Sequence, residues 1–125
     1  MLKYIDNMEF QKLLGVESVP DKFNQKVIEA SNYIKFKTFN RIDENNVSEQ
    51  VKYVTCLLIE LIDEEEKKLN EIGSLKSQNI EGWSETYSTP EEIKKDYDNK
   101  KYELLKQYLG NEIGVDGLPL LYVGV

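Results

Sequence analysis

Residues 51–62 have the sequence VKYVTCLLIELI, and this stretch decides the fold of the chain. Its apolar side chains occupy more than one face of a helix, which is typical of a helix surrounded by other elements. Ser48 can cap such a helix at its start. At residues 63–68 the sequence changes to DEEEKK. We therefore expect a helix from 48 to about 73 whose second half projects beyond the core.

Three further helices are expected around this central one. The segment 6–14 begins with a capping Asp6 and is followed by Gly15, a common helix stop. The segment 21–39 has apolar residues at spacings of four, three and four, which form one helical face. Those residues are Phe23, Val27, Ala30 and Ile34. The segment 89–109 begins with Thr-Pro-Glu-Glu, which combines a capping Thr with Pro at the first helical position.

Residues 74–88 change character. The segment 82–87 alternates large and small side chains, which predicts a strand, and residues 75–80 can pair with it as a hairpin. Trp83 and Tyr87 share one face of that strand. They can stack on a nucleobase or a sugar, but only one basic residue lies nearby in the sequence. We therefore favour a structural or protein-interface role for both.

The last segment, residues 111–125, ends in an apolar run, whereas solvated tails are usually polar. Its candidate partner-binding residues are Leu118, Leu120, Leu121, Tyr122, Val123 and Val125. Either the segment folds back onto its own domain, or it is an arm that binds another chain. We favour the arm, because strand addition to a partner's sheet edge suits a short extended segment. A single arm binds weakly, because the entropy lost on ordering its backbone cancels most of the free energy gained by burial. Many arms on one ring bind strongly through effective concentration.

The expected fold class is therefore mainly α. We expect a helical body of about four helices in residues 1–110, with a short β-hairpin at about 74–88, and an extended C-terminal arm in residues 111–125. A chain of 125 residues has the length of one domain.

The composition argues against several classes of function. The chain has no His and a single Cys, Cys56, which we expect to be a packed core thiol because it lies in the most apolar helix. We expect no catalytic activity, no cofactor and no metal. The formal net charge of −7 disfavours binding to duplex DNA or to anionic lipid. With no apolar signal-peptide region near residue 1, we expect a cytoplasmic protein with no membrane segment.

Four consecutive acids, Asp63, Glu64, Glu65 and Glu66, offer carboxylate oxygens of the kind that Mg²⁺ and Ca²⁺ prefer. Consecutive helical positions point about 100° apart, however, so the four side chains cannot converge on one ion. We expect a solvated helix end instead.

Several short motifs, in their order and spacing, resemble those of the head–tail connector (adaptor) proteins of tailed bacteriophages and prophages of Gram-positive hosts. The resemblance covers nearly the whole chain. The matching segments are LLG at 13–15, TFNRI at 38–42, CLLIE at 56–60, GWSETYS at 82–88, YLG at 108–110 and LLYVGV at 120–125. The family's closing motif has a basic residue where this chain has Val123, which makes the tail more apolar. Residues 112–119 match only loosely.

The resemblance implies a non-enzymatic structural protein of the virion neck, assembled in the host cytoplasm. It implies a ring of twelve copies bound beneath the portal protein, with the C-terminal arm docked on the portal. The opposite face of the ring binds a downstream stopper or tail-completion protein, and DNA passes through the channel without sequence-specific contacts. The acidic residues 63–66 are then expected to face the lumen or the next neck protein, since like charge keeps DNA from adhering.

Two other functions compete with this one. A small dimeric regulator, similar to an antitoxin or an anti-repressor, would bury the apolar tail at a closed two-fold interface. An enzyme with a divalent metal at the acidic residues is the weaker competitor.

Overall fold

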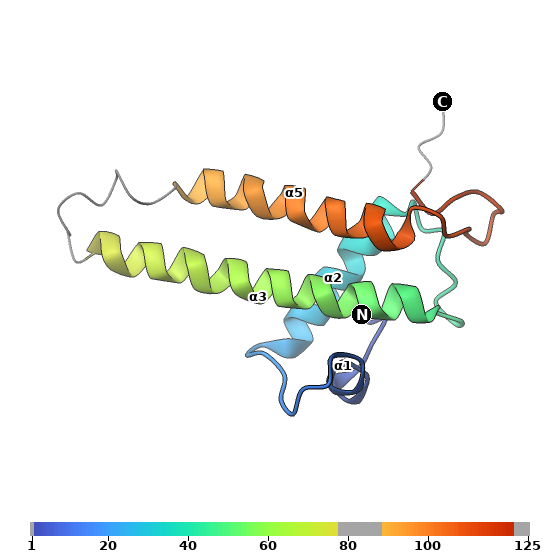
Figure 1. The fold of residues 1–125 in the computed structure, drawn as a ribbon, viewed down its shortest axis with the longest axis horizontal. Coiled ribbons are helices and arrows are strands. Elements are labelled where there is room, and N and C mark those ends of the chain that lie inside the picture. The colour runs from blue at the N-terminus through green and yellow to red at the C-terminus, as the bar shows by residue number, and fades with distance from the viewer. Residues whose placement is uncertain (1, 78–88, 122–125) are drawn as a thin grey trace.

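In the computed structural model, residues 2–77 and 89–121 are described, and they form four helices and no strand. The helices are α1 (Asn7–Leu14), α2 (Phe23–Lys37), α3 (Glu49–Ser77) and α5 (Pro90–Leu109). Figure 1 shows α3 and α5 side by side and antiparallel, with α2 crossing behind them and α1 beneath α3. The expectation of a mainly α chain with four helices is confirmed.

The predicted caps are present at the start of α1 and of α5 and at the end of α1. At α1 the Asp6 side chain accepts a hydrogen bond from the backbone N–H of Glu9 at 2.8 Å, and the Glu9 side chain accepts one from the N–H of Asp6 at 3.1 Å. Gly15 ends that helix with φ of +66°, which a residue without Cβ adopts without strain. At α5 the Thr89 hydroxyl accepts from the N–H of Glu92 at 3.2 Å. These local patterns therefore place the helix ends as expected.

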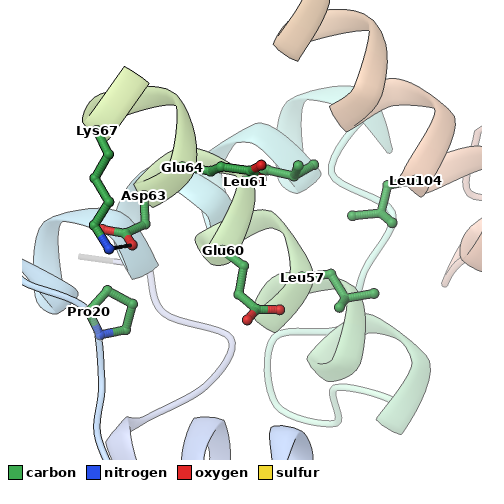
Figure 2. Close-up of a pocket in the computed structure, with 8 residues that line it drawn as sticks. All are labelled: Pro20, Leu57, Glu60, Leu61, Asp63, Glu64, Lys67 and Leu104. Carbon is green, nitrogen blue, oxygen red and sulfur yellow. Dashed lines mark ion pairs between the residues drawn. The ribbon is translucent and has the colours of Figure 1, made fainter. Parts of the chain in front are cut away.

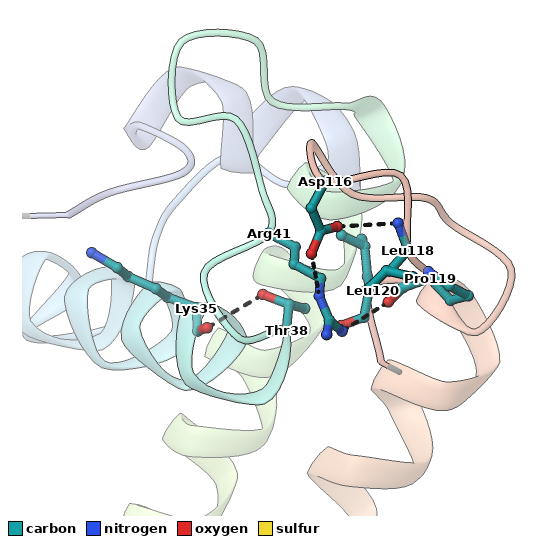
Figure 3. Close-up of polar contacts among 7 residues, drawn as sticks. All are labelled: Lys35, Thr38, Arg41, Asp116, Leu118, Pro119 and Leu120. Atoms are coloured by element: carbon teal, nitrogen blue, oxygen red, sulfur yellow. Dashed lines mark hydrogen bonds and ion pairs between the residues drawn. The ribbon is translucent and has the colours of Figure 1, made fainter. Parts of the chain in front are cut away.

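Helix α2 is shorter than expected at both ends. It begins at Phe23, after Lys22 in a left-handed conformation, and ends at Lys37. The chain then turns sharply, because Phe39 and Asn40 both have positive φ, of 55° and 58°. This turn delivers the next residue, Arg41, to the side of the body where α5 ends (Figure 3).

The main core surrounds α3, as its apolar sequence predicts. Its residues from α3 are at most 7% exposed: Val51, Val54, Cys56, Leu58, Ile59 and Ile62. Helix α2 contributes Val27, Ala30 and Ile34, all fully buried. Phe10 of α1 and two leucines near the end of α5, Leu105 and Leu109, complete the helical part of this core.

The second half of α3 does not project alone. A separate small core joins it to the first half of α5 through Ile72, Ile93 and Tyr97. Figure 1 shows these two halves extending together beyond α1 and α2. The expected projection is thus a two-helix arm with its own apolar contacts.

Helix α3 also continues past the expected stop at Gly73 and ends at Ser77. An isolated Gly inside a helix costs only about 1 kcal/mol relative to Ala, and no Pro follows to break the helix. The first part of the predicted hairpin, residues 74–77, is therefore helical. The remainder of that hairpin, with Trp83 and Tyr87, lies outside the described residues.

Within the described part of the chain, no helix combines the length and the apolar character needed to cross a membrane.

Candidate interaction site

The segment after α5 turns back on itself. Ile113 and Pro119 form an isolated antiparallel bridge. The N–H of Gly114 donates to the carbonyl of Leu118 at 2.7 Å, and the N–H of Leu120 donates to the carbonyl of Glu112 at 2.8 Å. Residues 111–121 therefore form a compact turn, which we call the C-terminal turn.

Arg41 holds this turn against the body (Figure 3). Its Nε donates to Asp116 Oδ2 at 3.0 Å, and its guanidinium also donates to the carbonyl of Pro119 at 3.0 Å. In return the carbonyl of Arg41 accepts from the N–H of Val115 at 2.9 Å. The guanidinium fork thus binds a carboxylate and a backbone carbonyl at once, a geometry that Lys cannot reproduce.

Close approach of the two backbones depends on Gly114. A Cβ at this position would lie 2.5 Å from the Cβ of Arg41 and 2.9 Å from its carbonyl oxygen. The pKa of the neighbouring Asp116 carboxyl is lowered, first by the backbone hydrogen bond from Leu118 and then by Arg41, against the opposing effect of desolvation. The carboxylate therefore stays charged at neutral pH and keeps its contact with Arg41.

Leu120 packs into the main core and is only 3% exposed. Leu121 is partly buried against the same core, and Leu118 is 40% exposed. Two of the predicted partner-binding residues are thus packed wholly or partly on their own body. The expected extended arm is not what residues 111–121 form, because Arg41 and the main core provide partners for them within the chain. Tyr122, Val123 and Val125 lie outside the described residues.

The C-terminal turn presents apolar side chains that the sequence analysis did not single out. Ile113 is 61% exposed and Val115 is 67% exposed, beside the partly exposed Leu118. Ile113 and Val115 are two positions apart, with Gly114 between them, and this pattern was the available signal for an apolar edge that faces outward. Together the three residues give this end of the body an apolar surface.

The four consecutive acids of α3 point to different partners. Asp63 accepts from Lys26 of α2 at 2.7 Å, and Lys67 lies 3.0 Å from its other oxygen. Glu65 pairs with Lys101 of α5 at 3.1 Å. Lys26 also lies 3.7 Å from Glu66. Asp63, Glu65 and Glu66 thus bind lysines of this chain, and only Glu64 has no ion pair in the described part.

The ion pair between Lys26 and Asp63 is the most enclosed polar contact between helices. Lys26 is 2% exposed, and its Nζ also donates to the carbonyl of Asp21 at 2.7 Å. Burial raises the pKa of the Asp63 carboxyl, but hydrogen bonds from Lys26 and Lys67 outweigh it, and the net pKa lies below the ordinary 3.8. No three metal-ligating side chains converge within residues 2–77 and 89–121. The acids of this helix therefore link helices as well as facing water.

A second apolar surface lies on α2 and just after it. Phe36 is 76% exposed and Phe39 is 52% exposed, and the two rings line one shared hollow. The available signal was Phe36 itself, a large apolar residue on the otherwise polar side of the helix. From the sequence, only the buried face of this helix was predicted.

Comparison of the chain with protein-family models, with curated proteins and with solved structures finds no match.

Proposed function

We propose that this chain is a structural head–tail connector of a tailed bacteriophage. In this proposal twelve copies form a ring under the portal protein, in the virion neck, and the ring binds a downstream stopper or tail-completion protein. The proposal assigns the chain no catalytic activity and no cofactor. DNA passes through the ring without being read.

One observation carries the proposal beyond the sequence motifs. Two of the segments that resemble the connector family, residues 38–42 and 120–125, are far apart in the sequence. Arg41 of the first segment donates hydrogen bonds to the turn that leads into the second, at Asp116 and Pro119. Residues 111–121 are therefore fixed at one end of the body (Figure 1). A fixed position is what a ring needs to present twelve identical docking segments.

The proposed docking element is narrower than the expected arm. Leu120 anchors the segment to its own core, so the portal contact falls to residues 122–125 and to the exposed Ile113, Val115 and Leu118. Burying a few such side chains contributes roughly 1.5–3 kcal/mol each before the costs of ordering. A single copy would bind weakly, and twelve copies on one ring would bind strongly through effective concentration.

The acidic character of the body supports a DNA channel in the same proposal. The formal net charge of −7 repels DNA that passes through the ring. Since lysines neutralise most of the charge at residues 63–66, acids elsewhere on the body must contribute to the lumen or to the face that meets the next neck protein.

The alternative is a small dimeric regulator, and one observation favours it. The exposed Phe36 and Phe39 offer an apolar surface that a two-fold interface would cover. This alternative predicts a discrete dimer that has no affinity for a portal.

The test is native mass spectrometry of the protein alone and mixed with the portal protein encoded in the same genome. The connector proposal predicts up to twelve copies of the 14.6 kDa chain added to one portal dodecamer. A discrete dimer that leaves the portal unbound would contradict it and favour the regulator.

A matched pair of variants tests the docking element. Changing Ile113 and Val115 to Ser is expected to lower portal binding at least tenfold while the melting temperature stays unchanged, because both side chains are already exposed. Met8→Ser removes an apolar side chain that is 78% exposed on α1 and is expected to leave portal binding unchanged. Unchanged portal binding in the Ile113 and Val115 variant would show that these two side chains do not contact the portal.

A further inference from the structure

The two exposed phenylalanines lie on the outer side of α2 and just after its end. Residues 32, 35 and 36 have the spacing of one helical face, Phe39 follows in the turn after α2, and all four residues line the same hollow. The buried residues of α2, Val27, Ala30 and Ile34, lie on the opposite side of the helix. We call Phe36 and Phe39, with Lys35 beside them, the aromatic patch. The Nζ of Lys37 lies 5.8 Å from the centre of the Phe36 ring and 5.3 Å from that of Tyr102 on α5, so this second positive charge lies between the patch and α5.

A pocket of about 490 Å³ lies elsewhere on the body (Figure 2). Its apolar lining comes from Leu57 and Leu61 of α3, Leu104 of α5 and Pro20. Its acidic residues include Glu60 and Glu64, both exposed and neither in a direct ion pair within the described part of the chain. The charge of Glu64 also acts on Tyr97 and Lys100 of α5 and contributes to raising the pKa of each. Asp63 and Lys67 also line it, but they neutralise each other. We call this the acidic pocket.

The patch and the pocket lie on different parts of the body. On α3, residues 57, 60, 61 and 64 form one stripe with the spacing of a single helical face. Residues 55, 59 and 62, which are buried, lie on the other side of α3. Pro20 and Asp63, which pairs with Lys26 of α2, border the pocket toward the start of α2. The patch lies at the other end of α2, and the two surfaces share no residue.

We propose that the acidic pocket of one copy receives the aromatic patch of a second copy. Apolar rings meet an apolar lining, and the lysines beside the rings meet Glu60 and Glu64. Because the two surfaces differ and share no residue, a patch seated in a pocket is a head-to-tail contact. Repetition of a head-to-tail contact closes a ring where the rotation permits, and otherwise builds a filament.

This inference rests on the proposed function, because the ring has a role only if the chain is a connector. A contact made by two phenylalanine side chains in one pocket is small beside a standard interface of roughly 1,200–2,000 Å², so a single contact is expected to be weak. Closure of a ring makes each contact depend on the others and strengthens the whole. Glu64 then faces a neighbouring subunit rather than the channel.

A complementation experiment tests the pairing without the portal. The patch variant carries Phe36→Ser and Phe39→Ser, and the pocket variant carries Glu60→Lys and Glu64→Lys. All four side chains are exposed, so both variants are expected to fold, which circular dichroism melting checks. Each variant retains one working surface. Sedimentation equilibrium up to millimolar concentration then measures the mass of each variant alone and of the equimolar mixture.

The pairing predicts that each variant alone stays at 14.6 kDa and that the mixture forms a dimer of twice that mass and nothing larger. The wild-type chain is expected to form larger species under the same conditions. Control variants Met8→Ser and Lys95→Glu alter exposed residues outside both surfaces and are expected to associate like wild type. A mixture that stays monomeric, or a patch variant that dimerises alone, would overturn the pairing.

The outcomes separate this inference from the proposed function. If the wild-type chain adds to the portal while the mixture stays monomeric, the connector role stands and the pairing fails. If the mixture gives the single dimer while the wild-type chain ignores the portal, the pairing stands and the connector role fails.

Discussion

Arg41 joins parts of the chain that lie 75 to 79 positions apart in the sequence. Its side chain is only 10% exposed, and its Cζ lies 5.0 Å from the centre of the Phe39 ring. One residue thus contacts the end of the α2 segment, the C-terminal turn and the edge of the aromatic patch. Any change at Arg41 is expected to affect all three.

Leu120 gives the first prediction at this scale. Its side chain is 3% exposed in the main core, so Leu120→Ala leaves a cavity and is expected to lower the free energy of unfolding by about 2–4 kcal/mol. Leu118→Ala removes the same atoms from a side chain that is 40% exposed and is expected to change stability by less than about 1 kcal/mol. Urea denaturation followed by circular dichroism measures both. Equal effects would show that Leu120 is not part of the core.

The difference between expectation and structure at Leu120 has a physical cause. The sequence shows that the residues from 118 onward are apolar, but not which surface covers them. That choice depends on Arg41, on the absence of a Cβ at Gly114 and on the core residues against which Leu120 packs. None of these is local to the segment. The caps at Asp6 and Thr89, by contrast, involve residues three positions apart, and the sequence predicts them well.

At the scale of elements, buried ion pairs join the helices. Lys26 links α2 to Asp63 of α3, and Lys101 links α5 to Glu65 of α3. These acids were expected to be solvated, because a run of acidic residues does not reveal which lysines from other helices will form ion pairs with them. Their pairing emerges only when α2 and α5 cover two sides of α3.

Lys26→Met is expected to destabilise the chain by about 3 kcal/mol at neutral pH, near the lower end for breaking a buried pair, because Lys67 still accompanies Asp63. The pKa of Asp63 is lowered in the folded state. Its contribution is therefore present above the ordinary pKa of 3.8 and is lost as pH falls through the folded value. In Lys26→Met the decrease in the free energy of unfolding between neutral and acid pH is therefore expected to be smaller than in wild type.

Unfolding curves of wild type and Lys26→Met between pH 2 and pH 7 provide the measurement, because these limits lie on either side of the ordinary Asp pKa of 3.8. Lys95→Met, at an exposed lysine with no ion pair in the described residues, is the matched control and is expected to follow wild type. Parallel curves for all three proteins would mean that the pair contributes nothing to the acid dependence.

At the scale of the whole molecule, the C-terminal turn is part of the body rather than an addition to it. Removal of residues 118–125 deletes Leu120 from the core and the Pro119 carbonyl from Arg41. The shortened chain is expected to lose at least as much stability as Leu120→Ala. Thermal melting of the two proteins checks this, and a shortened chain as stable as wild type would contradict it.

The truncation result also decides how binding data are interpreted. A shortened chain that is both less stable and unable to bind the portal does not show that the deleted residues touch the portal. The exposed Ile113 and Val115 are better sites for that question, because changing them leaves the core intact.

The long separation between Arg41 and its partners has a consequence for synthesis. The ribosome adds roughly 5–20 residues per second, so about 4–16 s pass between the synthesis of Arg41 and that of Leu120. Helix α3 is complete at Ser77, before α5 begins at Pro90, so the surfaces of α3 that α5 and Leu120 will cover stay open to water until those residues are made. The nascent chain therefore exposes its most apolar helix at the stage when chaperones have greatest access to it.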